Sequence, residues 1–63
     1  MDFVKETRRQ ECLELSHKLE TDLKQNKEEA GQFFGGEILV AYAEAVDRAI
    51  EKIDQVQFSI KNL

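Results

Sequence analysis

The side chains best suited to chemistry lie in the first half of the chain. Glu14 and His17 are three residues apart, which is the Glu-x-x-His spacing of helical di-iron carboxylate sites. Such sites need further glutamates that point into a bundle. On a helical wheel, however, Glu14 and His17 both lie far from the nearest apolar residues, Leu15 and Leu19. We therefore expect both side chains to face solvent, and we predict no metal site.

The single cysteine and the glycine pair also favour structural interpretations. Cys12 and His17 are five residues apart, a spacing that does not place joint ligands on one face of a helix. We expect Cys12 to lie within an apolar stripe as a small buried hydrophobe. Gly35-Gly36 lacks the preceding strand and the following Lys-Ser or Lys-Thr of a phosphate-binding loop, so we predict a turn. No nucleophile stands beside a base, and we expect no catalytic residue, no cofactor and no small-molecule substrate.

Length and charge restrict the class of protein. A chain of 63 residues is one domain, and domains this small usually need disulfides, a metal or a partner chain for stability. One cysteine cannot form an internal disulfide and suits the reducing cytoplasm, where we expect the protein to act. No secretion signal or membrane-spanning apolar stretch is recognisable. The net charge of −4, with both signs interspersed, disfavours nucleic acid and membranes as partners.

The positions of the helix breakers predict the fold class. Proline is absent, and the three glycines fall within residues 31–36, so two long segments are joined by one short turn. We predict an all-α, antiparallel two-helix hairpin in one domain, residues 1–63. Its helices should span about 2–31 and 37–62, with the turn at about 31–36. Phe33 and Phe34 could meet a partner, but we expect them to fold over the loop end.

The two segments differ in apolar pattern. The first carries a thin stripe interrupted by Arg8, Asp22 and Asn26, and it leaves Leu13 and Phe3 pointing elsewhere. The stripe consists of Val4, Cys12, Leu15, Leu19, Leu23 and Ala30. The second segment has an unbroken seam with steps of three and four residues: Leu39, Tyr42, Val46, Ala49, Ile53, Val56, Ile60 and Leu63.

Ile38, Ala43, Ala45 and Ile50 widen that seam beyond what one neighbouring helix can cover. We therefore predict a third helical surface from a partner. We expect it most at the edge marked by Ile38, Ala45, Ala49 and Val56. The predicted partner-binding residues are Ile38, Leu39, Tyr42, Ala45, Val46, Ala49, Ile50, Ile53, Val56 and Ile60.

This layout resembles the small type III secretion needle co-chaperones of the YscE/PscE type. The similar stretch runs from about Leu15 to Lys61. It includes Leu19-Glu20, Leu23-Lys24, the Gly35-Gly36 turn, Ala49-Ile50, Ile53 and Val56. The resemblance implies a cytosolic co-chaperone that docks on a tetratricopeptide-type chaperone, which in turn holds the needle subunit before export. Phe33-Phe34 before the glycines and Glu37-Ile38 after them depart from the family's loop.

A second hypothesis fits the same seam. Two hairpins could pack as a homodimeric four-helix bundle that acts as a regulator or adaptor. A regulator of the sporulation type gains little from Ser16-His17-Lys18-Leu19-Glu20, because the residues beside the serine are of the wrong types. The co-chaperone and the homodimer therefore both remain open at this point.

Overall fold

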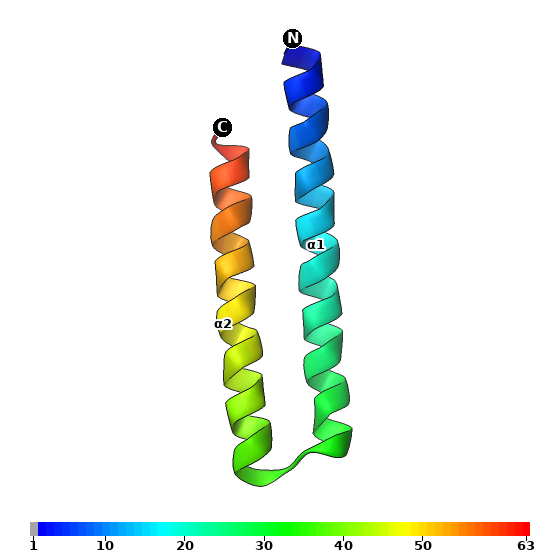
Figure 1. Ribbon diagram of the computed structural model, residues 1–63, viewed down its shortest axis with the longest axis vertical. Helices are drawn as coiled ribbons and strands as arrows, with labels where there is room; N and C mark the ends of the chain where they lie inside the picture. The colour runs from blue at the N-terminus through cyan, green and yellow to red at the C-terminus, as the bar shows by residue number, and fades with distance from the viewer. Residues whose placement is uncertain (1) are drawn as a thin grey trace.

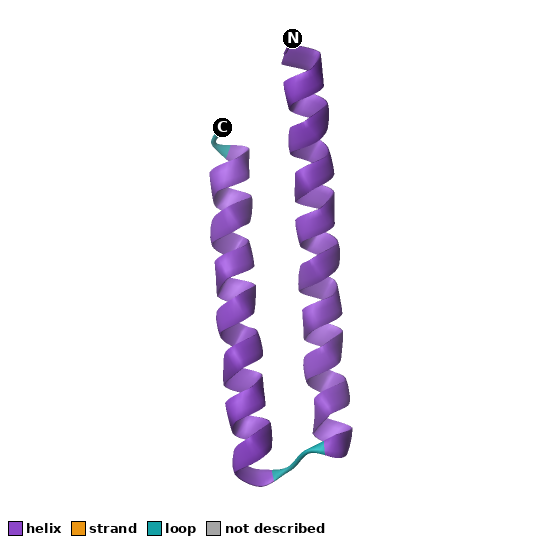
Figure 2. Cartoon of the chain, in the orientation of Figure 1, coloured by secondary structure: helices purple, strands orange, loops and turns teal. Residues whose placement is uncertain are grey.

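The computed structural model describes residues 2–63 as two antiparallel helices joined by a tight turn. Helix α1 spans Asp2–Phe33 and helix α2 spans Gly36–Lys61. The helices lie side by side along their length, and the N-terminal end of α1 extends beyond the end of α2 (Figure 1). Within residues 2–63, only the short link between the helices and the two residues after α2 are non-helical (Figure 2). The predicted all-α hairpin is confirmed.

The turn is shorter than predicted. The backbone N–H of Phe34 donates to the Ala30 carbonyl at 2.9 Å, so the helix continues through Gly31 instead of ending there. A glycine inside a helix costs only about 1 kcal/mol relative to alanine, too little to end a helix that has no proline. The change of direction falls at Gly35, which is extended, and at Gly36, which has a φ of 59°. The predicted helix end at 31 was therefore two residues too early.

The α1 face turned toward α2 matches the stripe predicted from the sequence only at Leu23 and Ala30. The less exposed positions recur in steps of four and three, and α2 is the only other element available to cover them. They are Arg9, Leu13, Ser16, Glu20, Leu23, Lys27 and Ala30. Leu13, predicted to point away, is partly buried, whereas Leu15, Leu19 and Cys12 are exposed. The predicted stripe of α1 was chosen by its apolar residues. It was wrong at these positions because four of the seven inward residues are polar.

The seam of α2 was predicted better. Its partly or fully buried positions are Leu39, Tyr42, Ala43, Val46, Ala49, Ile50, Ile53, Gln57 and Ile60. Six of the eight predicted seam residues are among them. Val56 and Leu63 were wrongly included, because both are exposed. The buried position beside Val56 belongs to Gln57, whose amide nitrogen lies 3.3 Å from His17 Nδ1 across the hairpin.

The core between the helices is thin. Its buried apolar residues are Ala30 and Val46, with exposed fractions of 5% and 7%. No large side chain in the described part of the chain is fully buried. Polar contacts supply much of the remaining link between the helices, including Lys27 Nζ to Asp47 Oδ1 at 2.8 Å. The other apolar residues of this contact are only partly buried, so we infer that the isolated hairpin is marginally stable.

Aromatic packing closes the loop end only in part. The ring centroids of Phe34 and Tyr42 lie 5.8 Å apart, and the Tyr42 hydroxyl donates a hydrogen bond to Asn26 Oδ1. Phe33 is more exposed, at 79% against 45% for Phe34. Of the two phenylalanines expected to fold over the loop end, only Phe34 contacts the hairpin in this way.

The position of the turn can be tested by two glycine substitutions. Gly31→Ala should raise the free energy of unfolding by about 0.5–1 kcal/mol, because the position is helical and no atom lies within 4 Å of the added Cβ. Gly36→Ala should lower it by about 1–2 kcal/mol, because an L-residue is strained at positive φ. Urea unfolding followed by circular dichroism measures both. A destabilising Gly31→Ala with a neutral Gly36→Ala would place the turn at Gly31.

Candidate protein-binding surface

Eight exposed apolar residues form one face of the hairpin, which we call the open apolar face. Residues eighteen apart are separated by five full helical turns and so share an orientation. This spacing relates Leu15 to Phe33 on α1, and on α2 it relates Ile38 to Val56. The members of the face are Val4, Leu15, Leu19 and Phe33 of α1, Ile38, Ala45 and Val56 of α2, and Leu63 just beyond the end of α2.

The exposed residues of the two helices lie on the same side of the hairpin. A groove of about 540 Å3 at the open end is lined by Val4 and Cys12 from α1 together with Ile60 and Leu63 from α2. Val4 is eleven residues, or three turns, from Leu15 on α1. Leu63 lines another groove together with Val56 and Ile60. The stripes that begin at this groove therefore run along the same side toward the loop. The result is a two-helix apolar surface with no protein over it in the single chain.

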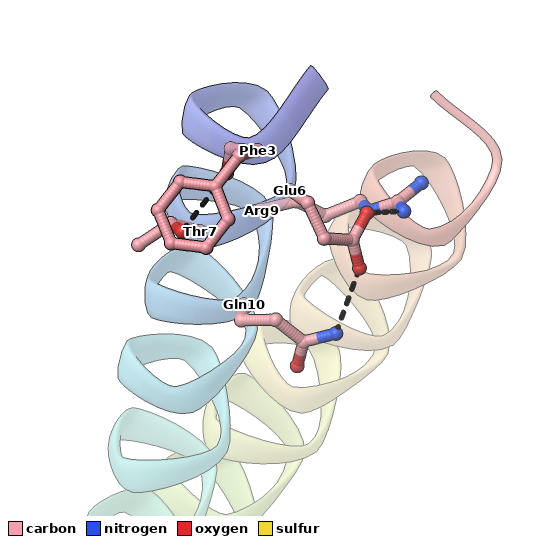
Figure 3. Close-up of polar contacts among 5 residues, drawn as sticks. All are labelled: Phe3, Glu6, Thr7, Arg9 and Gln10. Carbon is pink, nitrogen blue, oxygen red and sulfur yellow. Dashed lines mark hydrogen bonds and ion pairs between the residues drawn. The ribbon is translucent and has the colours of Figure 1, made fainter. Parts of the chain in front are cut away.

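The open end of this face has a basic rim. Lys5, Arg8 and Arg9 line the same groove, which has no acidic lining residue. Figure 3 shows Glu6 paired with Arg9 and accepting a hydrogen bond from Gln10 Nε2 at 3.2 Å. These cations lie beside the C-terminal end of α2, where the helix dipole favours positive charge.

The opposite side of the hairpin is more polar. Lys27 and Asp47 form an ion pair there, and Lys24 Nζ lies 3.3 Å from Glu20 Oε1 on the neighbouring turn. Leu39, Ala43 and Ile50 line a second groove on this side, but Lys24, Lys27, Glu28, Gly31 and Asp47 complete its lining. Charged side chains already partnered within the chain gain little from a new neighbour. The open apolar face is therefore the stronger candidate for binding.

The predicted partner-binding residues divide into three groups. Ile38, Ala45 and Val56 are exposed and belong to the open apolar face. Val46 is buried between the helices. The other six are partly buried along the seam: Leu39, Tyr42, Ala49, Ile50, Ile53 and Ile60.

Sequence reasoning missed the contribution of α1 to this surface. Val4, Leu15 and Leu19 were assigned to cover α2, but they stand beside that contact and remain exposed. A signal was available, because Leu13 and Leu23 define a second stripe that is offset from the first. Phe3, Val40 and Phe58 are also exposed and lie outside the open apolar face; of these, Phe3 was predicted to point away from the apolar stripe.

The residues considered for chemistry stay apart. Glu14 and His17 are exposed, as predicted, although His17 also contacts Gln57 across the hairpin. Cys12 is exposed, so its predicted burial was wrong. Within residues 2–63 no three His, Cys, Asp or Glu side chains gather in a way that could hold a metal ion. Neither helix, as described, has the length and apolar character needed to cross a membrane.

Comparison with known proteins identified no relative of this chain. No family model, curated protein or solved structure matches the chain. The interpretation of the open apolar face therefore rests on the residues that form it.

The rotation of α1 can be tested by truncating neighbouring leucines. Leu13→Ala should lower the free energy of unfolding by about 1–2 kcal/mol, because the side chain is partly buried against α2. Leu15→Ala should change it by less than about 0.5 kcal/mol in dilute solution, because Leu15 is 68% exposed. Urea denaturation of the two variants provides the comparison. The reverse order of effects would show that α1 turns its Leu15 stripe toward α2.

Proposed function

We propose that this protein is a helical-hairpin binding module that docks its open apolar face on a helical surface of another protein, in the manner of a co-chaperone. The observation that carries the proposal is the distribution of apolar residues. Seven large apolar side chains and Ala45 are exposed along one side, whereas only Ala30 and Val46 are buried apolar residues between the helices. Contiguous apolar surface of this kind marks interaction sites in soluble proteins.

The shape of the face favours a helical partner. Side chains on two parallel ridges, one from each helix, leave a shallow valley between them, and a third helix fits such a valley by packing ridges into grooves. The small side chains of Ala45 and Ala49 on α2 allow a partner helix to approach closely. A helical partner would bury the face without requiring new backbone hydrogen bonds.

Marginal stability gives such docking a function. A partner that binds only the folded hairpin stabilises it by mass action, and the hairpin in turn covers apolar surface on the partner. At about 25 cal/mol per Å2, each 100 Å2 of apolar surface removed from water contributes about 2.5 kcal/mol. Mutual stabilisation of two incomplete folds is the activity expected of a co-chaperone.

The sequence resemblance supports one partner class. The small type III secretion needle co-chaperones resemble this chain in length, in their hairpin layout and at the residues from Leu15 to Lys61. We therefore propose a cytoplasmic, tetratricopeptide-type chaperone that holds a needle subunit as the first partner to test. Helix pairs of such a repeat protein present helical surfaces of the required kind.

The proposal predicts that charge on the open apolar face abolishes docking. The double substitution Ala45→Glu with Val56→Glu should weaken capture of the partner by at least about 100-fold, because binding would bury two unpaired carboxylates. Both residues are exposed, so the hairpin should remain helical by circular dichroism. Val40→Glu is the matched control, because Val40 is exposed elsewhere on α2 and its substitution should leave capture intact. Tagged chains in source-cell extract, with mass spectrometry of the captured proteins, provide the measurement.

Cys12 gives an independent readout on the native chain. Its thiol is exposed and lines the groove at the end of the open apolar face. Saturation with the captured partner should slow its alkylation by at least about tenfold, because a docked helix excludes the reagent as folded structure does. Failure to capture any helical-repeat protein, or capture that leaves Cys12 fully reactive, would contradict the proposal.

A further inference from the structure

We infer that, in the absence of its partner, the open apolar face is covered by a second copy of this chain, packed face to face and end for end. The two hairpins then form a four-helix bundle in which the open end of each copy lies over the loop end of the other. The inference rests on the proposed function, because it assigns an occupant to the same face. It goes further by specifying the partner, the orientation and the residues at the symmetry axis.

The apolar residues of the face are distributed as end-for-end pairing requires. An isologous contact brings each part of the face onto another part of the same face, so apolar residues must be balanced about its centre. Val4 and Leu63 lie at the open end, and Phe33 and Ile38 lie at the loop end. Leu19 lies midway between Val4 and Phe33 along α1. End-for-end pairing therefore places apolar ends on apolar ends, with Leu19 of both copies near the axis.

Charge favours this orientation over parallel pairing, in which the two hairpins would also pack face to face but with both open ends at the same end of the bundle. The contacts of Asn26 with Tyr42 and of His17 with Gln57 place residues 20 and 51 at about the same height along the hairpin. The loop half, residues 20–51, has eight acidic and three basic side chains, a net charge of −5. The remaining residues have six basic and five acidic side chains, a net charge of +1. Parallel pairing would bring the two −5 halves together, whereas end-for-end pairing sets each against the other copy's +1 half.

The charged residues at the ends of the face agree with the net charges of the two halves. Lys5, Arg8 and Arg9 rim the groove at the open end of the face. Arg9 lies ten residues before Leu19 on α1 and Glu29 lies ten residues after it, so pairing about Leu19 sets Arg9 of one copy at the height of Glu29 of the other. End-for-end pairing directs the three cations of one copy toward the acidic half of the other. Parallel pairing would place six cations at one end of the bundle.

The dimensions of the hairpin suit a dimer. The Cα trace measures 52 × 16 Å across its two longer axes, so the face is long and wide enough for a second hairpin to lie along it. Each hairpin supplies two of the four helices of a bundle. The core at the centre of such a bundle is absent from the single chain. Leu15 and Leu19, exposed in one copy, become core residues in the pair.

Two measurements test the pairing. Light scattering of the purified full-length chain should give twice the 7.3 kDa mass of one chain. In a Cys12→Ser background, a short bis-maleimide should cross-link Leu19→Cys into covalent dimers. It should not cross-link Val4→Cys, because end-for-end pairing separates the two Val4 positions by roughly 45 Å at 1.5 Å rise per residue. In parallel pairing α1 lies over α2 of the other copy, so the two Leu19→Cys positions would not face each other and would not be cross-linked.

Matched charge variants complete the test. Leu19→Glu should reduce the mass to that of one chain, because it sets two carboxylates near the axis, whereas Val40→Glu should leave the dimer intact. A monomeric wild-type chain, or a dimer without the Leu19→Cys cross-link, would overturn the inference. A monomer that still captures a helical-repeat partner would refute the pairing and leave the proposed function standing. A cross-linked dimer that captures no such partner would support the pairing and refute that function.

Discussion

The two helices meet along one seam in which Ala30 and Val46 are the buried apolar residues. Every other feature of the molecule depends on how little apolar surface this contact hides. The other apolar residues of the seam are only partly buried, so their burial offsets less of the conformational entropy lost when the described residues become ordered. We propose that the hairpin needs more apolar burial than it supplies to itself, and that another helical surface provides it over the open apolar face.

Polar residues explain why α1 is rotated as it is. Arg9, Ser16, Glu20 and Lys27 occupy inward positions that a stable two-helix core would give to apolar residues. Three of them are long charged side chains, whose aliphatic parts can pack while their charged groups reach partners near the edge of the seam. Arg9 pairs with Glu6, Glu20 with Lys24, and Lys27 with Asp47. This arrangement leaves Leu15 and Leu19 available for another chain.

Much of the fold followed from the sequence, and the remainder depended on contacts between the helices. The absence of proline and the position of the glycines were sufficient for two helices and a turn. The heptad spacing of Leu39, Val46 and Ile53 was sufficient for the inward side of α2. The facing side of α1 was not predictable from one helical wheel, because its apolar residues fall on two stripes. The choice between them depends on ion pairs such as Lys27 with Asp47 and on the contact of His17 with Gln57, all of which require the partner helix to be placed first.

We propose that folding and association of this chain are one process, and the concentration dependence of the thermal midpoint tests this most directly. If the open apolar face must be covered for the hairpin to be stable, the midpoint followed by circular dichroism should rise steadily with the concentration of the chain, because dimerisation stabilises the folded state by mass action. A sharp transition at a midpoint that does not change with concentration, from a chain that sediments as a monomer, would contradict the account. That result would show that the seam around Val46 is sufficient to hold the two helices together.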